Sequence, residues 1–407
     1  MKILVLNAGS SSMKFTLFSM ENEQVLAKGQ VERLGSDKPN MIYKRSDGYV
    51  EEGLIKENTP VGALRKICEK LIDPEHGVLK SLCEIDAIGH RVLHGGEKIT
   101  APIRIDAQAK EIIRECFPLG PLHNPANLAG IEACEKEMPG VPNVGVFDTQ
   151  FHMTMPPEAY LYALPYEYYR KFGIRKYGFH GTSHHYVTLA TAKFLGRCPE
   201  ELNLITCHLG NGCSMAAVRK GKVIDTSMGL TPLEGLVMGT RCGDLDPAAV
   251  LRLLELGHSR EEVDQILNKQ SGLLGVAGIG SSDMRDIIAA EQAGNEQALQ
   301  ARKMFIRRVV KYIGAYYALL DGADALVFTG GIGEWSAYTR EHVLSALGCL
   351  GIRFDSAKNN ETLGKRGVIS TPDSKLTVVV MPTDEELMIA RSVVKTLYPE
   401  KSADCNR

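Results

Sequence analysis

The chain has 407 residues, of which 44% are hydrophobic and 24% charged, and its formal net charge is −2. This length exceeds what one hydrophobic core usually holds, and the composition is that of an ordinary globular protein. Lysine and arginine are spread along the chain, so no basic block indicates nucleic-acid binding, and no apolar run is long enough to span a bilayer.

The first apolar run, residues 3–6, is too short for the core of a signal peptide and lacks a cleavage pattern. The ten cysteines include no CxxC pair, a usage typical of reduced thiols in a cytosolic enzyme. Cys207 and Cys213 lie close in sequence, but one such pair does not by itself indicate a metal site. We therefore expect a cytoplasmic protein.

Short apolar runs alternate with helical patterns along the chain. The runs predict buried strands over residues 3–6, 87–89, 144–147, 204–207, 325–328 and 376–381. Helical spacing of apolar residues predicts a long helix over 296–320. The last helix is predicted over 385–397, after the helix-start sequence Pro-Thr-Asp. This alternation predicts an α/β fold.

Two strand–turn units recur in the same order. The segment ILVLNAGSSSMKF near the start resembles LITCHLGNGCSMAA at 204–217, and IDAIGHRVLHGGE at 85–97 resembles ADALVFTGGIGE at 323–334. Repetition in one order predicts two related lobes. A boundary is expected near residue 150, where a strand ends and a pair of prolines follows.

Three turns have the small residues that suit phosphate binding. In the first, residues 9–12 read Gly-Ser-Ser-Ser, and Lys14 follows; converging backbone N–H groups, hydroxyls and an ammonium all bind anions. In the second, 208–214, Gly210 and Gly212 flank Asn211. The third, 328–334, precedes a helix predicted from Trp335. Each alone also fits a plain turn, but three together favour a nucleotide enzyme.

Arginine and histidine recur among glycines after predicted strands. The segment GHRVLHGGE holds Arg91, and MGTRCGDLDP holds Arg241. Guanidinium groups in this context suit bidentate capture of carboxylate or phosphate. His123 and His180 lie in similar segments, but the histidines are too scattered to predict a zinc site. His184, with its neighbour, opens a helical run and is interpreted as a surface or capping residue.

Carboxylates complete the set. Asp148 ends a predicted strand and Glu385 starts the final helix. Acidic groups at such positions hold Mg²⁺ directly or through water, although an acid in the first turn of a helix equally favours the helix dipole. Asp244 and Asp246 are predicted to cap a helix that begins at Pro247.

Taken in order, these motifs resemble the acetokinase family, within the superfamily of acetate and sugar kinases, heat-shock ATPases and actin. The matching segments are NAGSSSMKF, GHRVLHGGE, PLHNP, VFDTQFHMTMP, RKYGFHGTSH, CHLGNG, TPLEGLVMGTRCGDLDP, FTGGIGE and TDEELMIA, which together cover nearly the whole chain. The resemblance implies two similar lobes with a duplicated βββαβαβα core (the actin-like ATPase fold), an active site in the interlobe cleft, and a homodimer. The N-terminal lobe, with the acyl and phosphate side, would comprise 1–149 and 386–407, and the nucleotide-binding C-terminal lobe 150–385.

The activity that this resemblance implies is acetate kinase activity. In that reaction the γ-phosphate of ATP passes reversibly to acetate by direct in-line transfer, giving acetyl phosphate and ADP, with Mg²⁺ as cofactor and Mn²⁺ as a substitute. No nucleic acid or membrane partner is implied. Two alternatives remain open: a propionate kinase of the same family, and a non-catalytic actin-like nucleotide-binding switch. A switch needs no clamp for an acyl carboxylate, so the arginine and histidine set argues against it.

The resemblance also assigns residues to roles. Catalysis falls to Asp148, His180, Arg241, Arg91 and His123. The acyl group would meet Arg91, Leu93, Leu122, Phe179 and Pro232. Phosphates and adenosine would meet Ser10, Ser12, Lys14, His208, Leu209, Gly210, Asn211, Gly212, Asp283, Met284, Arg285, Gly331, Ile332, Gly333, Glu334 and Trp335. The metal ligands would be Asn7 and Glu385.

Four positions depart from the usual family pattern. Trp335 replaces Asn and Met284 replaces Phe on the adenosine side, and Asp384 stands where Asn is common. Trp335 either covers the nucleotide or is an exposed aromatic residue at a helix start. Leu93 stands where Val is common; its extra methylene should favour acetate over propionate by about 1–3 kcal/mol.

Overall fold

The computed structural model of the chain describes residues 1–402. These residues form two compact units: unit 1 comprises Met1–Gln150 with the C-terminal segment from Asp384, and unit 2 comprises Phe151–Thr383. The described cysteines are free thiols, and Cys405 lies outside the described residues. No helix within residues 1–402 is long and apolar enough to cross a membrane.

Unit 1 is built on a mixed sheet with the strand order β5-β4-β3-β2-β1-β6-β8-β7. Strand β1 pairs in parallel with β6, and β6 with β8, whereas β1, β2 and β3 form an antiparallel meander. The strands are β1 (Lys2–Ala8), β2 (Ser12–Ser19), β3 (Gln24–Glu32), β4 (Asn40–Arg45), β5 (Val50–Leu54), β6 (Ala87–Val92), β7 (Ile103–Arg104) and β8 (Asn143–Phe147).

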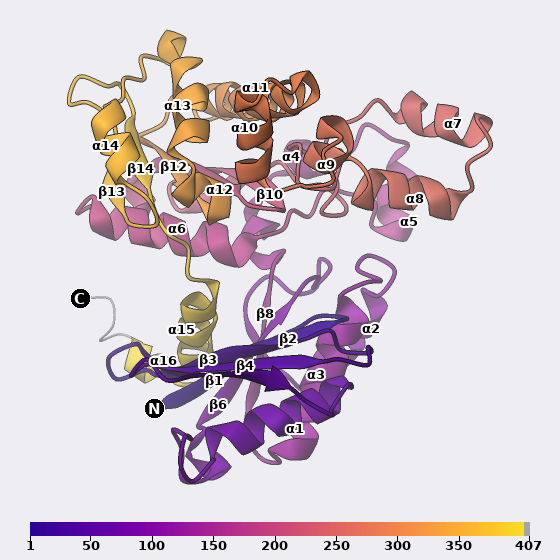
Figure 1. Cartoon of the computed structure of the whole chain (residues 1–407), viewed down its shortest axis with the longest axis vertical. Helices are drawn as coiled ribbons and strands as arrows, with labels where there is room; N and C mark the ends of the chain where they lie inside the picture. Colours follow the sequence, from indigo (N-terminus) through magenta and orange to yellow (C-terminus); the bar gives the residue numbers. More distant parts are fainter. Residues whose placement is uncertain (403–407) are drawn as a thin grey trace. The chain divides into compact units, whose positions relative to one another are not determined.

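Helices cover both faces of this sheet. Helices α1 (Pro60–Leu71) and α3 (Asn124–Glu137) lie on one face and α15 (Glu385–Leu397) on the other, as Figure 1 shows. Gly89 in β6 permits the close approach of α15, because a Cβ atom there would lie 2.7 Å from Cγ2 of Ile389. Helices α2 (Ala107–Glu115) and α16 (Pro399–Ser402) complete the unit.

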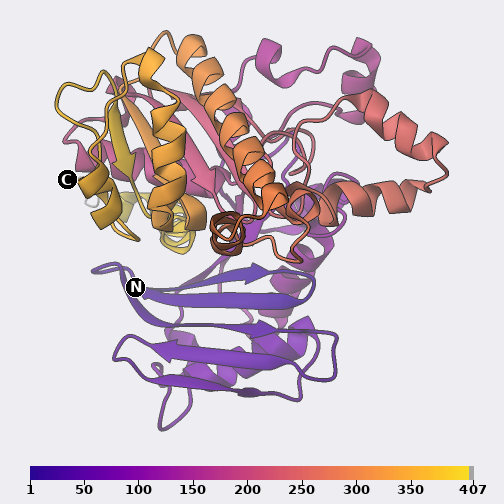
Figure 2. The same ribbon diagram turned by 45° about the horizontal axis from the view of Figure 1, so that its top comes forward.

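Unit 2 has a second mixed sheet, with the order β11-β10-β9-β12-β14-β13. Helix α6 (Gly181–Phe194) packs on one face, and α11 (Glu296–Leu319) runs along the other (Figure 2). The strands are β9 (Asn203–Leu209), β10 (Cys213–Arg219), β11 (Lys222–Thr226), β12 (Ala325–Thr329), β13 (Gly367–Val368) and β14 (Thr377–Val380). The remaining α-helices are α4 (Pro157–Tyr160), α5 (Tyr166–Phe172), α7 (Pro247–Glu255), α8 (Arg260–Lys269), α9 (Gly272–Ala277), α10 (Met284–Gln292), α12 (Gly330–Trp335), α13 (Ala337–Ser345) and α14 (Ser356–Glu361).

The two sheets repeat one plan. The order β3-β2-β1-β6-β8 in unit 1 corresponds to β11-β10-β9-β12-β14 in unit 2, with the same parallel and antiparallel pairings. Even a detail recurs: Asp86 accepts the backbone N–H of Lys2 at 2.6 Å, and Asp324 accepts that of Asn203 at 2.7 Å. The predicted strands, the repeat and the duplicated α/β fold are therefore confirmed.

Two local predictions are wrong. The helix after the third glycine turn begins at Gly330 rather than at Trp335, because the glycines themselves form its first turn. Asp246 caps α7 by accepting the N–H of Ala248 at 2.9 Å, but Asp244 does not cap it. The carboxylate of Asp244 instead accepts hydrogen bonds from the N–H of Gly235 and from the hydroxyl of Tyr312.

Candidate functional site

The first phosphate-suited turn joins β1 to β2. It closes through a hydrogen bond from the Gly9 N–H to the Ser12 carbonyl at 2.8 Å. The side chains of Ser10 and Lys14 are exposed there, and Asn7 is the β1 residue that pairs with Lys14. The turn thus presents hydroxyl groups, an amide and an ammonium group at the carboxyl end of the parallel strands, the edge at which such sheets bind ligands.

Arg91 and Asp148 form a bidentate ion pair at the same edge of unit 1. Nε of Arg91 donates to Oδ1 of Asp148 at 2.9 Å, and Nη2 donates to Oδ2 at 2.7 Å. Asp148 is fully buried, and its own N–H donates to the Val92 carbonyl. Burial acts to lower the pKa of Arg91, but the charges of Asp148 and Glu385 outweigh it and raise that pKa. Asp148 therefore fixes the plane of a permanently charged guanidinium group.

Glu385 starts α15 beside this pair, with Oε2 lying 3.8 Å from Nε of Arg91. The pKa of Glu385 is raised to about 7, chiefly by burial; Arg91 acts to lower this pKa, and the nearby Asp148 and Glu386 carboxylates act to raise it. Asp384 caps the helix by accepting the Leu387 N–H at 2.8 Å. So much negative charge around a buried carboxylate suits a bound cation.

Two asparagines that the sequence did not single out fix the loops around Arg91. On α3, Asn127 donates to the Ala8 carbonyl at 2.6 Å and accepts the Leu93 N–H at 3.0 Å. Asn124 accepts the His94 N–H and donates to its carbonyl. Both asparagines are buried, so their amides substitute for a strand partner where the chain leaves β1 and β6. Only the packed helix brings them there.

The predicted acyl residues of unit 1 differ in exposure. Leu93 is buried, whereas Leu122 is 61% exposed in the loop that leads to α3. His123 occupies the N-cap position of α3. His90 bonds Asn143 at 2.7 Å, and burial lowers its pKa to about 4, so this imidazole is neutral and structural. Of these two neighbouring residues, Arg91 is therefore the candidate for substrate binding and catalysis.

In unit 2 the turn between β9 and β10 is the centre of the candidate site. Gly210 donates its N–H to the Gly212 carbonyl at 3.1 Å, so a backbone hydrogen bond also closes this turn, which is one residue shorter than the turn in unit 1. A Cβ atom on Gly212 would lie 3.4 Å from Nε2 of His180 and 3.6 Å from Nη1 of Arg241. A Cβ atom on Gly210 would lie 3.9 Å from the backbone nitrogen of Gly331. The predicted phosphate residues of unit 2 therefore surround one turn.

Arg241 differs from Arg91 because no carboxylate in the described part of the chain pairs with it. Its Nη1 donates to the Pro232 carbonyl at 3.2 Å, and within residues 1–402 it forms no ion pair. Burial lowers the pKa of Arg241. Its loop is closed where Asp244 and Gly235 exchange hydrogen bonds, and Arg308 on α11 donates to the Gly235 carbonyl at 2.6 Å. A guanidinium group held in this way keeps its charge for an anion.

His180 precedes α6 as its N-cap residue, in the left-handed conformation with φ 56°. A non-glycine residue pays strain of order 1 kcal/mol in that conformation, which is commonest at functional sites. Its ring stacks on that of His208, with centroids 4.3 Å apart. Phe179, the predicted acyl contact before it, is buried, and its carbonyl bonds His152 at 2.9 Å.

The prediction that His184 is a surface or capping residue is wrong. It is a fully buried residue of α6, and its Nε2 lies 2.8 Å from Oγ of Ser214, which in turn lies 2.8 Å from Nδ1 of His180. Burial, with smaller effects of His152 and His208, holds the pKa of His184 well below its usual value. Helical spacing from His180 was the available sequence signal, because residues i and i+4 share a helix face.

The predicted adenosine residues lie on two segments of unit 2. Glu334 accepts the N–H groups of Gly330 and Thr383 with one oxygen, at 2.9 and 3.1 Å, so its carboxylate is structural. Trp335 is 63% exposed and packs over Gly364. On the other segment, Asp283 caps α10 and pairs with Arg285, while Met284 is buried. Ser282 approaches Asn211 at 3.4 Å, which brings this segment to the turn.

A buried arginine supports the short helix α12, which ends at Trp335. Arg340 on α13 donates to the carbonyls of Gly333 and Glu334 at 2.8 and 2.9 Å, and to Asn359 and Thr362 on the far side. Burial lowers its pKa to about 10. The sequence gives no signal for this role, because it depends on two segments that meet only in the fold.

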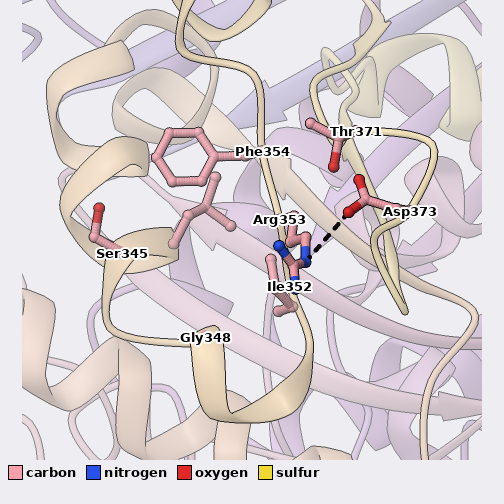
Figure 3. A pocket seen from close by; sticks show the side chains of 8 residues that line it. Ser345, Gly348, Ile352, Arg353, Phe354, Thr371 and Asp373 are labelled. Atoms are coloured by element: carbon pink, nitrogen blue, oxygen red, sulfur yellow. Dashed lines mark ion pairs between the residues drawn. The ribbon is translucent and has the colours of Figure 1, made fainter.

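A separate pocket of about 420 Å³ lies elsewhere in unit 2 (Figure 3). It is lined by Leu344, Ser345, Gly348, Ile352, Arg353, Phe354, Thr371 and Asp373, and Arg353 pairs with Asp373 across it at 3.3 Å. None of the predicted site residues lines it. Among the residues that the structure describes, no cluster of three or more His, Cys, Asp or Glu side chains could hold a metal by itself.

The chain is similar over almost its full length to proteins of known family. Residues 2–391 match the model of the Acetokinase family. The acetate kinase of Dictyoglomus turgidum is 53% identical over 398 residues, 98% of each chain. The crystal structure of Porphyromonas gingivalis acetate kinase superposes with a TM-score of 0.93 at 47% identity, covering 97% of this chain and 99% of that one. A propionate kinase from Francisella tularensis superposes with a TM-score of 0.90 at 42% identity, covering 96% and 98%.

These matches confirm the family that the motifs predict. The turns, the two arginines and the histidines thus belong to a chain whose relatives named above are acetate and propionate kinases. The chain belongs to the acetokinase family and is a phosphotransferase.

Proposed function

We propose that the protein is an acetate kinase that transfers the γ-phosphoryl group of ATP reversibly to acetate. An acetate oxygen forms a bond to the γ-phosphorus, the bond from that phosphorus to the β,γ-bridging oxygen breaks, and ADP leaves. The observation that carries this proposal is the 53% identity to an acetate kinase over 98% of both chains. The carboxylate is ionised at neutral pH, so no general base is needed.

Unit 1 supplies the acceptor side. Asp148 occupies Nε and Nη2 of Arg91 and leaves Nη1 to bind the acetate carboxylate. Asp148 thus acts by holding Arg91, not by removing a proton. Leu93 and Leu122 of this unit, and Phe179 and Pro232 of unit 2, are the residues that we assign to the methyl group, and His123 assists transfer.

Unit 2 supplies the donor side. Backbone N–H groups of the 210–212 turn and the amide of Asn211 bind the phosphates, and Ser10, Ser12 and Lys14 of unit 1 add further donors. Arg241 and His180 meet at Gly212, where their charge neutralises the equatorial oxygens of the transferring group. An arginine in this role contributes about 10³–10⁵ in rate.

The donor set of unit 1 fits a divalent cation. Asn7 offers an amide oxygen and Glu385 a carboxylate in acidic surroundings, and both are hard oxygen ligands of the kind that Mg²⁺ prefers. Two protein ligands suffice, because Mg²⁺ keeps several waters and binds substrate phosphates. Mn²⁺ takes similar ligands and is proposed as a substitute. When bound, the metal neutralises charge on the β- and γ-phosphates.

The adenosine site is assigned to Gly331–Trp335 and to Asp283, Met284 and Arg285. The exposed face of Trp335 suits stacking on the base. Trp335 is the only tryptophan, so its fluorescence reports this contact directly. Saturating ATP should quench or shift its emission; an unchanged spectrum would contradict stacking.

A homodimer is proposed from the apolar surface of unit 2. Helix α7 buries none of its residues, and Leu251 and Leu254 on it are 60% and 42% exposed. Leu245 and Leu256 beside it are also exposed. An apolar patch of this kind marks an interface, and twofold pairing is the commonest oligomer. Sedimentation of wild type and of Leu251→Glu tests it: a monomeric wild type would contradict the proposal.

The reaction itself is tested by trapping the acyl phosphate with hydroxylamine. The protein with ATP and Mg²⁺ is offered acetate, propionate and butyrate in parallel, with metal-free and acid-free controls. Acetate should give the highest kcat/KM. A higher value for propionate would favour the alternative activity, which the Francisella structure keeps open. No hydroxamate from any acid would contradict kinase activity on carboxylates.

A further inference from the structure

His180 is linked to the interior of unit 2 by a continuous chain of hydrogen bonds. Its Nδ1 lies 2.8 Å from Oγ of Ser214, and that oxygen lies 2.8 Å from Nε2 of His184. Nδ1 of His184 lies 2.7 Å from Oγ1 of Thr206, which donates to the Ala216 carbonyl at 3.4 Å. Ser214, His184 and Thr206 are all fully buried.

The fold explains why these groups meet. In the β9–β10 ladder Thr206 pairs with Ala216 and His208 pairs with Ser214. Residues two apart on a strand share a face, so Thr206, His208 and Ser214 point to the same side of the sheet. Helix α6 packs on β9 and brings His184 to that side.

The direction of each proton in the chain follows from its inner end. A carbonyl can only accept, so the Thr206 hydroxyl donates to Ala216 and its oxygen accepts Nδ1–H of His184. His184 is neutral, because burial keeps its pKa low, and therefore carries one proton. Its Nε2 must then accept from the Ser214 hydroxyl, whose oxygen accepts Nδ1–H of His180.

We propose that Thr206, His184 and Ser214 form a relay that fixes His180 in the Nδ1–H tautomer, so that its Nε2 bonds the transferring phosphoryl group only as an imidazolium. These three are positioning residues, since they act through His180. The contact with the phosphoryl group rests on the proposed function, whereas the tautomer of His180 follows from the hydrogen bonds alone. With Nδ1 committed inward, the atom facing the Gly212 turn is Nε2. Protonation at Nε2 then adds positive charge beside Arg241 without any reorientation inside the protein.

The tautomer is read in the wild type without any substrate. In protein labelled with [¹⁵N]histidine, long-range ¹H–¹⁵N spectra distinguish the two tautomers, and His180→Asn assigns the signal. Above the titration of His180, we expect proton-bearing Nδ1 and bare Nε2. The opposite pattern in the wild type would overturn the proposal, and this result needs no variant to fold and no enzymatic activity.

A substitution at Thr206, the inner end of the relay, should reverse the direction of its hydrogen bonds. Thr206→Val keeps the shape of the side chain but removes the hydroxyl, so His184 is free to place its proton on Nε2 and the Ser214 hydroxyl turns toward His180. His180 should then switch to the Nε2–H tautomer. We expect kcat for acetyl phosphate formation to fall about tenfold, the gap between hydrogen bonds to charged and to neutral groups. The KM for acetate should change little.

Two further variants separate the relay from packing. Thr206→Ser restores a hydroxyl and should rescue the wild-type tautomer. Thr191→Val makes the same change on α6, at a buried hydroxyl with no hydrogen-bond partner in the described residues, and should alter neither tautomer nor kcat. An unaltered His180 tautomer in Thr206→Val, or equal loss of kcat in Thr206→Val and Thr191→Val, would overturn the proposal. A wild type that forms no acetyl phosphate would contradict the proposed function but leave the tautomer result standing.

Discussion

Units 1 and 2 share one backbone plan but bring different chemistry to the same edge of their sheets. In each, an antiparallel hairpin leads into parallel strands, and a helix packs on one face: α15 in unit 1 and α6 in unit 2. Glu385 begins the first of these helices, and His180 caps the second. The duplicated frame thus fixes where functional residues stand, while side chains decide what they bind.

The two arginines show the difference most clearly. Arg91 is bound by two oxygens of Asp148 with Glu385 nearby, whereas Arg241 donates, among the described residues, to the Pro232 carbonyl and the Met238 sulfur. In unit 1 the arginine is therefore part of a network of ion pairs. In unit 2 the positive charge of the arginine is not neutralised by a carboxylate among the described residues and can bind an anion. The following predictions test that contrast.

The largest effect is expected from Arg241→Ala. Because this arginine has no ion-pair partner within residues 1–402, its loss should leave the melting temperature almost unchanged. The kcat for acetyl phosphate formation should fall by about 10³-fold or more. Arg307→Ala, which removes an exposed arginine on α11, is the matched control and should behave as wild type. A loss in Arg241→Ala of under tenfold would contradict its assignment.

Asp148→Ala should damage stability as well as rate. It leaves Arg91 without its bidentate partner, and breaking such a pair costs about 3 kcal/mol when one member keeps partial exposure. Urea unfolding measures that cost, and the hydroxamate assay measures a fall in kcat of about 10²-fold from misplacement of Arg91. Full stability in Asp148→Ala would show that the pair does not hold unit 1 together.

Leu93→Ala should change selectivity. Leu93 is buried beside the Asn127 contact, so removing its side chain enlarges the space assigned to the acyl group. The ratio of kcat/KM for acetate over propionate should fall by about tenfold or more, within the range for one or more methylenes. Equal ratios in wild type and variant would contradict the prediction that Leu93 determines which length of carboxylic acid the enzyme prefers.

The smallest effects are expected at Asp86 and Asp324, the aspartates that occupy equivalent positions in the two units. Asp86→Ala should destabilise the protein by about 1 kcal/mol, through one hydrogen bond to Lys2. Asp324→Ala should cost more, since Asp324 also binds Arg197 at 2.8 Å. Thermal melting ranks them, with the exposed Asp37→Ala as control, and kcat should be unaffected. A large loss of kcat in either would mean that these residues do more than position strands.

The sequence allowed much of this to be predicted. Apolar runs located the parallel strands β1, β6, β8, β9, β12 and β14, but not the other strands of the two sheets. The repeated strand–turn pairs indicated the duplication, and Arg91 and Arg241 stood out among glycines. The supporting contacts could not be predicted from the sequence, because they join residues that are far apart in the chain: Asn127 with Ala8, Arg340 with Asn359, and His184 with Ser214. His184 was misread because its place beside the loop suggested a surface residue, whereas helix packing buries it.

The division of labour between the units is tested most directly by calorimetric titration with ADP. Arg91→Lys keeps the positive charge beside Asp148, and its dissociation constant for ADP should stay within about twofold of wild type, as for an independent site. Asn211→Ala removes an exposed amide at the unit 2 turn and should weaken ADP binding about tenfold, the loss of one charge-assisted hydrogen bond. Equal weakening in both variants, or weakening in Arg91→Lys alone, would contradict the account.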